Sequence, residues 1–422
     1  MPEPTRTHTV IVGAGIAGLW LAEKLTAAGD RVTILERNGY VGGRVYTRRK
    51  DGEQYEIGAG RISVNHTHTN ALIDRFGLTR IPLSPDLDWK ADGYTPSLPN
   101  NFDPTWSAIA TEISRLPPTT LATHTLSQLA ARLLGGAAAA DRLLARFPYR
   151  TETERMRADI ALRAFVPGGE MASHAGYFVV KEGLTAILVR LLRQIRRTRR
   201  ADIYLNTTVA DVRSNPAGGY SVILKGPHPS IHADRVILTI PATALRQLPV
   251  LRNIPPLRHL GMAPLTRIYA RYPASPRAPV WFAGLPATVT ATPLRYVIPI
   301  NPAKGIIMIS YTDDRDTAPW HGLKKPALTE AIQAEAHRLF PMRPIPPPLW
   351  VRAYEWDTGA TFWRPGHYDP ATVSTQMLQP RPSTMPGLFC AGESFSVGRQ
   401  AWIEGALEHA AALWETHLSN GR

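Results

Sequence analysis

The sequence has one cysteine, Cys390, in 422 residues, so a disulfide within the chain is excluded. A chain this poor in cysteine fits a reducing compartment. No apolar run approaches the roughly 18 residues that a membrane-spanning helix needs. Residues 1–10 also lack the charged start and apolar stretch of a secretory signal. We therefore expect a cytoplasmic protein with no membrane contact.

Acidic residues are the minority charge: 34 Asp and Glu stand against 48 Lys and Arg, and the formal net charge is +14. A positive surface attracts acidic partners over long distances. Arginines are concentrated in residues 193–200, directly after an apolar pattern of helical spacing over residues 184–192. Three readings stay open: a helix with a solvated basic face, a surface that contacts nucleic acid or another polyanion, and a genome whose base composition favours arginine. The sequence also leaves the oligomeric state open.

Glycines with a characteristic spacing follow the first strand-like run. Residues 8–12 are apolar and β-branched, and Gly13, Gly15 and Gly18 come next, at the start of a helical pattern. In a dinucleotide-binding unit the first glycine makes the tight turn, the second lets backbone N–H groups approach a pyrophosphate, and the third lets the helix pack against the strand. The alternative is a set of glycines that only makes a turn.

An acidic residue ends the second strand-like run. Residues 31–35 precede Glu36, which follows Gly18 by 18 residues. This is near the spacing of the acid that binds a ribose in such units. The hydrophobic content of 44% predicts a well-formed core, and the strand–helix–strand opening predicts an α/β fold with a Rossmann-type nucleotide-binding domain.

The next motif, Gly42-Gly43-Arg44, resembles the FAD-dependent amine oxidase superfamily, which includes monoamine, polyamine and L-amino-acid oxidases. The resemblance implies that the glycine pair and Arg44 close over the pyrophosphate of FAD, where the guanidinium would neutralise phosphate charge. Arg37, beside the ribose-binding acid, is expected to contact the cofactor too. A surface arginine after a flexible turn is the alternative for Arg44.

The resemblance extends to the centre and to the end of the chain. Residues 389–393 and 402–408 are similar to the last strand and the start of the last helix of the superfamily, and residues 233–241 to a central strand. It implies that Gly392 and Glu393 lie near the ribityl and phosphate groups and that Val209 contacts adenine. The helix that starts at Trp402 and Ile403 would face the pyrimidine end of the flavin, where its dipole stabilises negative charge.

Arg61 carries the substrate prediction. Residues 56–62 resemble the segment of L-amino-acid oxidases that ends in a carboxylate-binding arginine, and Gly60 and Arg61 are also expected near the cofactor. A guanidinium pairs bidentately with a carboxylate, and would aim the α-carbon at flavin N5. The alternative is that Arg61 contacts a flavin phosphate or a neighbouring carboxylate.

Trp402 is expected to form one aromatic wall of the substrate site, with a tryptophan of the core as the alternative. The superfamily commonly has an aromatic residue on the opposite wall, at about the position of Thr361. Threonine is not aromatic, so the sequence does not identify the residue that forms this wall.

Arg267 departs from the superfamily, which usually places a lysine there, bonded through water to flavin N5. Arginine can position water but cannot relay a proton, so the use of oxygen as electron acceptor stays open. The alternative is that Arg267 is not the residue that corresponds to the lysine of the superfamily. Cys390 lies inside the last strand and not where covalent attachment occurs, so we expect non-covalent FAD. We expect no metal ion.

The motifs predict two interleaved domains. The FAD-binding domain would comprise residues 1–65, 201–262 and 383–422, and an α+β substrate-binding domain would comprise residues 66–200 and 263–382.

Three functions are compatible with this organisation. The first is removal of a hydride from the CH–NH2 group of an L-amino acid or related amine, giving an imine and then a keto acid and ammonia. The second is oxidation of a primary amine or polyamine. The third is a flavin-binding protein of low turnover with a structural or polyanion-binding role.

Overall fold

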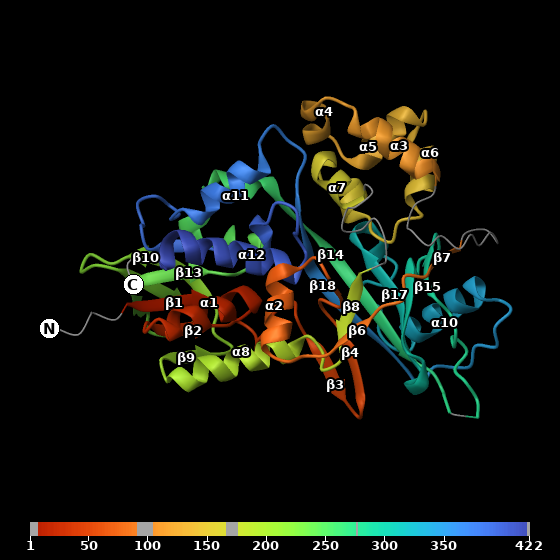
Figure 1. The fold of residues 1–422 in the computed structure, drawn as a ribbon, viewed down its shortest axis with the longest axis horizontal. Coiled ribbons are helices and arrows are strands. Elements are labelled where there is room, and N and C mark those ends of the chain that lie inside the picture. The colour runs from red at the N-terminus through yellow and green to blue at the C-terminus, as the bar shows by residue number, and fades with distance from the viewer. Residues whose placement is uncertain (1–6, 91–103, 166–175, 276, 420–422) are drawn as a thin grey trace.

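The computed structural model describes residues 7–90, 104–165, 176–275 and 277–419. Figure 1 shows a parallel sheet with its helices at one end of the molecule, a second sheet at the other end, and a group of short helices above the second sheet. Within the described ranges, no helix combines the length and the apolar character needed to cross a membrane.

The first sheet is the predicted dinucleotide-binding sheet. Its five strands run in the order β19-β13-β1-β2-β9, and all neighbours are parallel. The strands are β1 (His8–Val12), β2 (Arg31–Leu35), β9 (Ala201–Tyr204), β13 (Arg235–Leu238) and β19 (Leu388–Cys390). Both faces of a parallel sheet are covered, which explains why β1 and β2 are almost entirely buried and apolar. The predicted α/β fold is confirmed.

Three helices pack beside this sheet: α1 (Ile16–Ala27), α8 (Thr185–Thr198) and α12 (Ile403–Leu413). Helix α1 contacts both α8 and α12, and the three share one hydrophobic cluster. Helix α8 lies in the stretch predicted to belong to the substrate-binding domain, yet it packs on α1. The predicted domain boundaries remain a proposal.

The second sheet has six strands in the order β18-β14-β17-β16-β15-β7. They are β7 (Leu87–Lys90), β14 (Leu260–Arg271), β15 (Ala287–Thr290), β16 (Tyr296–Asn301), β17 (Ile306–Asp313) and β18 (Trp350–Trp363). Helix α10 (Ala327–Leu339) packs with it in a hydrophobic cluster of its own. Strands β14 and β18 are the longest and pair along their whole length, from Leu260 opposite Trp363 to Arg271 opposite Trp350. They extend from the first half of the molecule into the second (Figure 1).

Smaller elements complete the chain. The remaining strands are β3 (Thr47–Lys50), β4 (Glu53–Glu56), β5 (Ile62–Ser63), β6 (Arg80–Pro82), β8 (Tyr177–Val180), β10 (Val209–Ser214), β11 (Tyr220–Leu224) and β12 (Ile231–Ala233). The remaining helices are α2 (Thr67–Arg75), α3 (Pro104–Ser114), α4 (Pro118–Thr123), α5 (Leu126–Leu133), α6 (Ala137–Leu144), α7 (Ala158–Phe165), α9 (Ala242–Leu245) and α11 (Pro370–Leu378). In the part of the chain that the structure describes, two π-helical turns, η1 (Thr151–Arg155) and η7 (Trp414–Leu418), and five short 3-10 turns join them.

Glu404, in the first turn of α12, fastens this helix to α2. Its carboxylate accepts hydrogen bonds from the backbone N–H groups of His68 and Thr69, both at 2.8 Å, and from the hydroxyl of Thr69 at 2.7 Å. It thereby satisfies amides at the start of α2 that have no partner within that helix. Burial acts to raise the pKa of Glu404, but the hydrogen bonds from His68 and Thr69 outweigh it and lower that pKa to about 2.

Replacement of Glu404 by glutamine is expected to lower the free energy of unfolding by about 3 kcal/mol at pH 7. Because the folded-state pKa lies below the unfolded one, the ionised carboxylate stabilises the fold above about pH 4.5, and this contribution is lost as the pH falls toward 2. Denaturant unfolding at pH 7 and pH 3 measures the difference. The exposed Glu415→Gln serves as the control. Equal stabilities of Glu404→Gln and wild type at pH 7 would contradict this account.

Candidate active site

The glycines after β1 bring the backbone of the first turn and of α1 together. A Cβ added at Gly18 would lie 2.1 Å from the carbonyl oxygen of Gly13, and one added at Gly13 would lie 2.9 Å from the hydroxyl of Thr239. Gly13 also has a φ of +107°, which favours glycine. Gly15 differs, because nothing lies within 4 Å of an added Cβ there. The turn is therefore closed toward the sheet and open on the side of Gly15.

Glu36 lies beside this turn, as its spacing predicts. One carboxylate oxygen accepts from the N–H of Ala14 at 2.9 Å and the other from the N–H of Asn38 at 2.9 Å. The residue is buried, while Arg37 next to it is exposed. Val209, the predicted adenine contact, is half-buried at the start of β10.

The second glycine pair packs against the first turn. The N–H of Gly42 donates to the carbonyl of Ala14 at 2.8 Å, and Gly42 forms a parallel bridge with Gly15. Gly42 and Gly43 both have positive φ values, +117° and +56°, and an added Cβ at Gly43 would meet nothing within 4 Å. The structure thus brings together the two glycine-rich turns that are both predicted to contact the pyrophosphate.

Arg44 and Glu393 form an ion pair at the same place, with a nitrogen–oxygen distance of 2.6 Å. Arg44 also donates to the carbonyl of Gly359 at 3.2 Å. The buried carboxylate of Glu393 accepts in addition from the hydroxyl of Thr361 at 2.6 Å and from the N–H of Ala401 at 2.9 Å. Glu393 therefore joins the Arg44 turn, β18 and the start of α12. The predicted contact of Arg44 with a phosphate remains a prediction.

Arg61 lies within an enclosure of aromatic rings. Its guanidinium carbon is 4.5 Å from the centre of the Tyr177 ring, 5.7 Å from that of Trp402 and 6.0 Å from that of Tyr149. It donates to the hydroxyl of Tyr149 at 3.0 Å. The Trp402 ring stacks on Tyr177, with centroids 5.9 Å apart and an angle of 17°. The structure thus brings Arg61 and Trp402 together and adds Tyr177, which the sequence reasoning missed.

Arg267, on β14, is buried next to the same enclosure. It donates to the carbonyl of Glu56 at 3.2 Å, and its guanidinium lies over the ring of Tyr311 at 4.6 Å. An added Cβ at Gly60 would lie 2.9 Å from the guanidinium nitrogen of Arg267, so the two residues are in contact. The structure therefore brings Arg267 and the segment that ends in Arg61 together.

The tyrosines of the enclosure have no common signal in the sequence. Tyr149 follows α6, Tyr177 opens β8, Tyr296 opens β16 and Tyr311 lies within β17. Burial raises the pKa values of Tyr149 and Tyr296, that of Tyr296 to about 12, so their hydroxyls stay protonated. Only the folded chain brings these four rings to Arg61.

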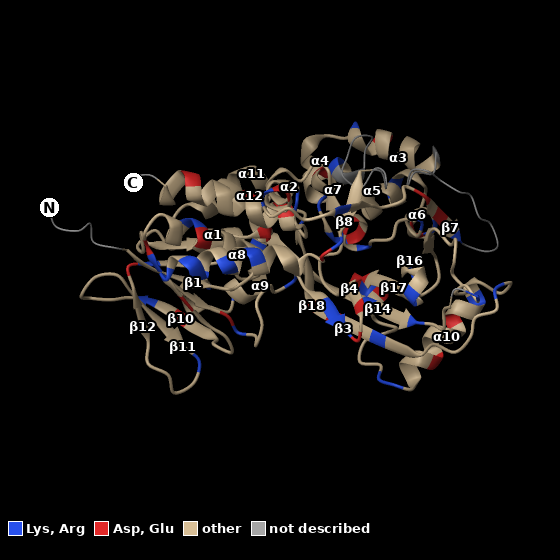
Figure 2. Cartoon of the chain, turned by 60° about the horizontal axis from the view of Figure 1, so that its bottom comes forward, with Lys and Arg blue, Asp and Glu red and all other residues tan. Residues whose placement is uncertain are grey.

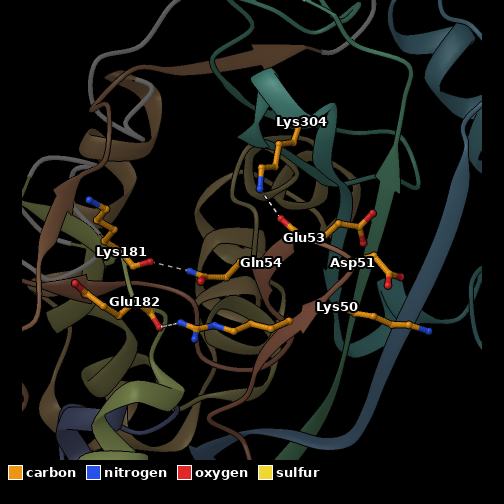
Figure 3. A pocket seen from close by; sticks show the side chains of 9 residues that line it. Lys50, Asp51, Glu53, Gln54, Lys181, Glu182 and Lys304 are labelled. Atoms are coloured by element: carbon orange, nitrogen blue, oxygen red, sulfur yellow. Dashed lines mark hydrogen bonds between the residues drawn. The ribbon is translucent and has the colours of Figure 1, made fainter.

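A pocket on the outer surface lies apart from this site. Figure 3 shows it at the β3–β4 hairpin. Its volume is about 620 Å3. Its lining groups bond to one another: Lys304 donates to the carbonyl of Gly52, Gln54 to that of Lys181 at 2.9 Å, and Arg49 to that of Glu182. The pocket contains none of the predicted site residues.

Comparison with known proteins gives the family. The model of the flavin containing amine oxidoreductase family matches residues 16–412, so the chain belongs to this family. The L-amino-acid oxidase of Siganus canaliculatus is 49% identical over 65 residues, which are 15% of this chain and 12% of that protein. The putrescine oxidase of Kocuria rosea is 48% identical over 69 residues, 16% of this chain and 14% of that protein. These matches span less than a fifth of each relative.

Solved structures share the fold over nearly the whole chain. A putrescine oxidase bound to putrescine superposes with a TM-score of 0.74 at 17% identity, covering 97% of this chain and 98% of that one. Cyclohexylamine oxidase from Brevibacterium oxydans superposes with a TM-score of 0.75 at 16% identity, covering 97% and 99%. At these identities the likeness concerns the fold.

The family implies a flavin cofactor, and the residues of this chain fit one with a pyrophosphate. Open space borders Gly15, Gly43 and Gly392, where an added Cβ would meet no atom within 4 Å. Helix α1 starts beside Gly15, and the first N–H groups of a helix attract anionic groups. The glycines therefore leave room where the helix offers its positive end.

The close approach at Gly18 predicts the effect of one methyl group. Gly18→Ala is expected to lower the free energy of unfolding by about 1–3 kcal/mol and to displace the turn, so that the purified protein carries less flavin. Visible absorbance and thermal unfolding measure the two effects. Gly398→Ala is the control, since that glycine is exposed, has no positive φ and has open space around it. A full complement of flavin in Gly18→Ala would contradict the assignment of this turn.

Proposed function

We propose that the protein binds FAD non-covalently and oxidises an L-amino acid at the carbon that bears the amino group. Arg61 supports this proposal most directly. Among the residues that the structure describes, no carboxylate lies within ion-pair distance of its guanidinium, whose partners are the hydroxyl of Tyr149 and aromatic rings. A cation inside a protein without a counter-ion is costly, and a substrate carboxylate would supply the missing charge.

The residues around Arg61 have distinct roles in this proposal. Arg61 would bind the carboxylate bidentately and thereby orient the α-carbon. Trp402 and Tyr177 would hold the neutral amine by packing and exclude water. FAD, when bound, would take the hydride from the α-carbon, and the resulting imine would hydrolyse to a keto acid and ammonia.

The first half of the molecule would hold the cofactor. Glu36 would accept hydrogen bonds from the ribose and the start of α1 would face the pyrophosphate. The other predicted cofactor contacts are Gly13, Gly15, Gly18, Arg37, Gly43, Arg44, Gly60, Val209, Gly392, Glu393 and Ile403. Non-covalent binding is supported by Cys390, which is fully buried within β19 and whose pKa burial raises to about 12. A protonated, buried thiol is a poor nucleophile.

Arg267 bears on the electron acceptor. Its guanidinium can donate to a water molecule beside Gly60 but holds its proton at any physiological pH. We propose that Arg267 positions water near the flavin and does not relay protons. Oxygen is then one of several electron acceptors whose rates of flavin reoxidation can be compared.

Arg61→Gln is expected to lower kcat/KM for L-amino acids by about 100-fold, or about 3 kcal/mol, because a buried carboxylate would lose its partner. The loss should be much smaller for the corresponding amines that lack the carboxylate. Anaerobic flavin reduction with matched pairs, such as leucine and isopentylamine, measures this difference. Arg252→Gln, at an exposed position, is the control.

A different outcome would favour the second candidate, an amine or polyamine oxidase. If wild type reduced its flavin with amines and with no amino acid, Arg61 would have another role and the amino-acid proposal would be wrong.

A polyanion-binding role is supported by the exposed face of α8. Four residues at its end are exposed and, among the described residues, have no carboxylate within 4.0 Å; we call them the α8 arginines: Arg193, Arg196, Arg197 and Arg199. Figure 2 shows basic residues along α8. The predicted helix is confirmed, since Leu188, Leu191 and Ile195 are buried on its other side. We propose that this face contacts phosphate-rich polymers.

Neutralising the α8 arginines to glutamine is expected to weaken binding to duplex DNA about tenfold or more at low salt and to reduce its salt dependence. Fluorescence anisotropy over a salt series measures both. The matched control removes the same charge at exposed sites elsewhere: Arg252, Arg258, Lys324 and Lys325. Equal weakening by the two sets would show an effect of net charge alone and would contradict a specific face.

A further inference from the structure

A second unusual ionisable group lies near Arg61. Glu152 belongs to the π-helical turn η1, and one of its carboxylate oxygens is buried without a hydrogen-bond partner. Most buried polar atoms in proteins have a partner. Among the described residues no cation forms an ion pair with Glu152. The nearby Arg150 pairs instead with Glu154 at 3.0 Å and with Asp316 at 2.9 Å.

The carboxylate oxygens of the neighbouring acid, Asp313, both have hydrogen-bond partners. Its carboxylate accepts from the N–H groups of Arg150 and Thr151, both at 2.8 Å, and from the hydroxyl of Thr151 at 2.5 Å. Asp313 therefore holds the start of η1 in place. Glu152 is left as the acid with a free oxygen.

Arg61 and Glu152 lie near one another. Tyr149, three residues before Glu152, binds Arg61 through its hydroxyl. Tyr311, which contacts Tyr149, and Asp313 are two positions apart on β17, so they point to the same side of the sheet, about 7 Å apart. The charge of Arg61 acts on Glu152 as well, since it lowers the pKa of that carboxyl.

The surroundings of Glu152 make an external cation favourable. Burial and the charge of Asp313 hold the pKa of Glu152 well above its usual value, against the smaller effect of Arg61. A cation brought by a ligand would compensate the buried carboxylate and provide the hydrogen bond that its free oxygen lacks.

We propose that Glu152 binds the positively charged end of the substrate's side chain, so that the substrate class is L-amino acids with a cationic side chain. This inference rests on the proposed function, in which Arg61 binds the α-carboxylate. The two residues would then bind the two ends of one molecule. Arg61 would bind its carboxylate, and Glu152 would bind an ammonium or guanidinium at the end of a short alkyl chain.

The test compares lysine with norleucine, which has the same chain without the terminal amine. Wild type is expected to prefer lysine by at least about tenfold in kcat/KM for anaerobic flavin reduction. Glu152→Gln should bring this preference to about one, chiefly through KM for lysine. Glutamine has the shape of the protonated carboxyl, so the variant is expected to fold, which its thermal unfolding checks. The preference, not the absolute rate, is the readout.

Glu154→Gln is the matched control. It removes a carboxylate from the same turn, but one that Arg150 and Arg315 already bind, so the preference for lysine should persist. No preference for lysine in wild type, or an unchanged preference in Glu152→Gln, would overturn the proposal.

Failure of the proposed function gives a different pattern. If no amino acid reduced the flavin but amines did, the amino-acid assignment would fall, and a diamine would be compared with the monoamine of equal length. A diamine preference that Glu152→Gln abolishes would retain the cation site, and its absence would overturn it. If neither class reduced the flavin, thermal unfolding would decide: stabilisation of wild type by lysine or the diamine that Glu152→Gln abolishes would retain the cation site, and equal shifts in both proteins would overturn it.

Discussion

A close backbone approach in the half of the molecule that contains the parallel sheet, between α1 and the first turn, organises the site. At Gly18 there is room for a hydrogen atom and not for a methyl group, because the carbonyl of Gly13 lies in the way. This contact sets the start of α1 against the end of β1. The buried carboxylate of Glu36 and the N–H of Gly42 then bond to Ala14 within that turn. Three segments thus acquire fixed positions relative to one helix end.

Charged residues differ in whether they have partners within the protein. Glu393 and Arg44 compensate one another and fasten the start of α12 to β18. By contrast, Arg61 has no carboxylate partner and Glu152 has no cationic partner among the described residues. Proteins rarely leave charges in such positions without a function. A ligand with a carboxylate and a cation would supply the partner that each of the two residues lacks.

Elements that depend on short stretches of sequence could be predicted. The βαβ opening and the helix with a basic face follow from glycine spacing, strand ends and apolar periodicity, and the structure confirms these elements. Glu36 lies beside the first turn, and its contact with a ribose remains a prediction. Arg61, Trp402 and Arg267 were selected by resemblance, and the structure brings the first two into one enclosure with Arg267 beside it. Their roles in catalysis remain predictions.

The sequence could not predict the tyrosines and Glu152. Tyr149, Tyr177, Tyr296 and Tyr311 come from different elements, and each is unremarkable in its own neighbourhood, where an aromatic residue fits an ordinary buried strand or turn. The acid Glu152 lies among charged neighbours in residues 150–155, and only the fold shows that Glu154 is paired and Glu152 is not. Long-range pairing places several of these residues, since β5 pairs with β8 beside Arg61 and Tyr177, and β14 pairs with β17 at Arg267 and Tyr311. Such pairing has no short-range signal.

The most direct measurement is to identify the small molecule that the purified protein releases on heat denaturation. We expect FAD, in an amount equal to that of the protein and recovered without proteolysis, since no covalent bond would hold it. A preparation that releases no flavin, and takes up none when FAD is supplied in excess, would contradict the central claim. The roles proposed for Arg61 and Glu152 as parts of an oxidase would then have to be abandoned.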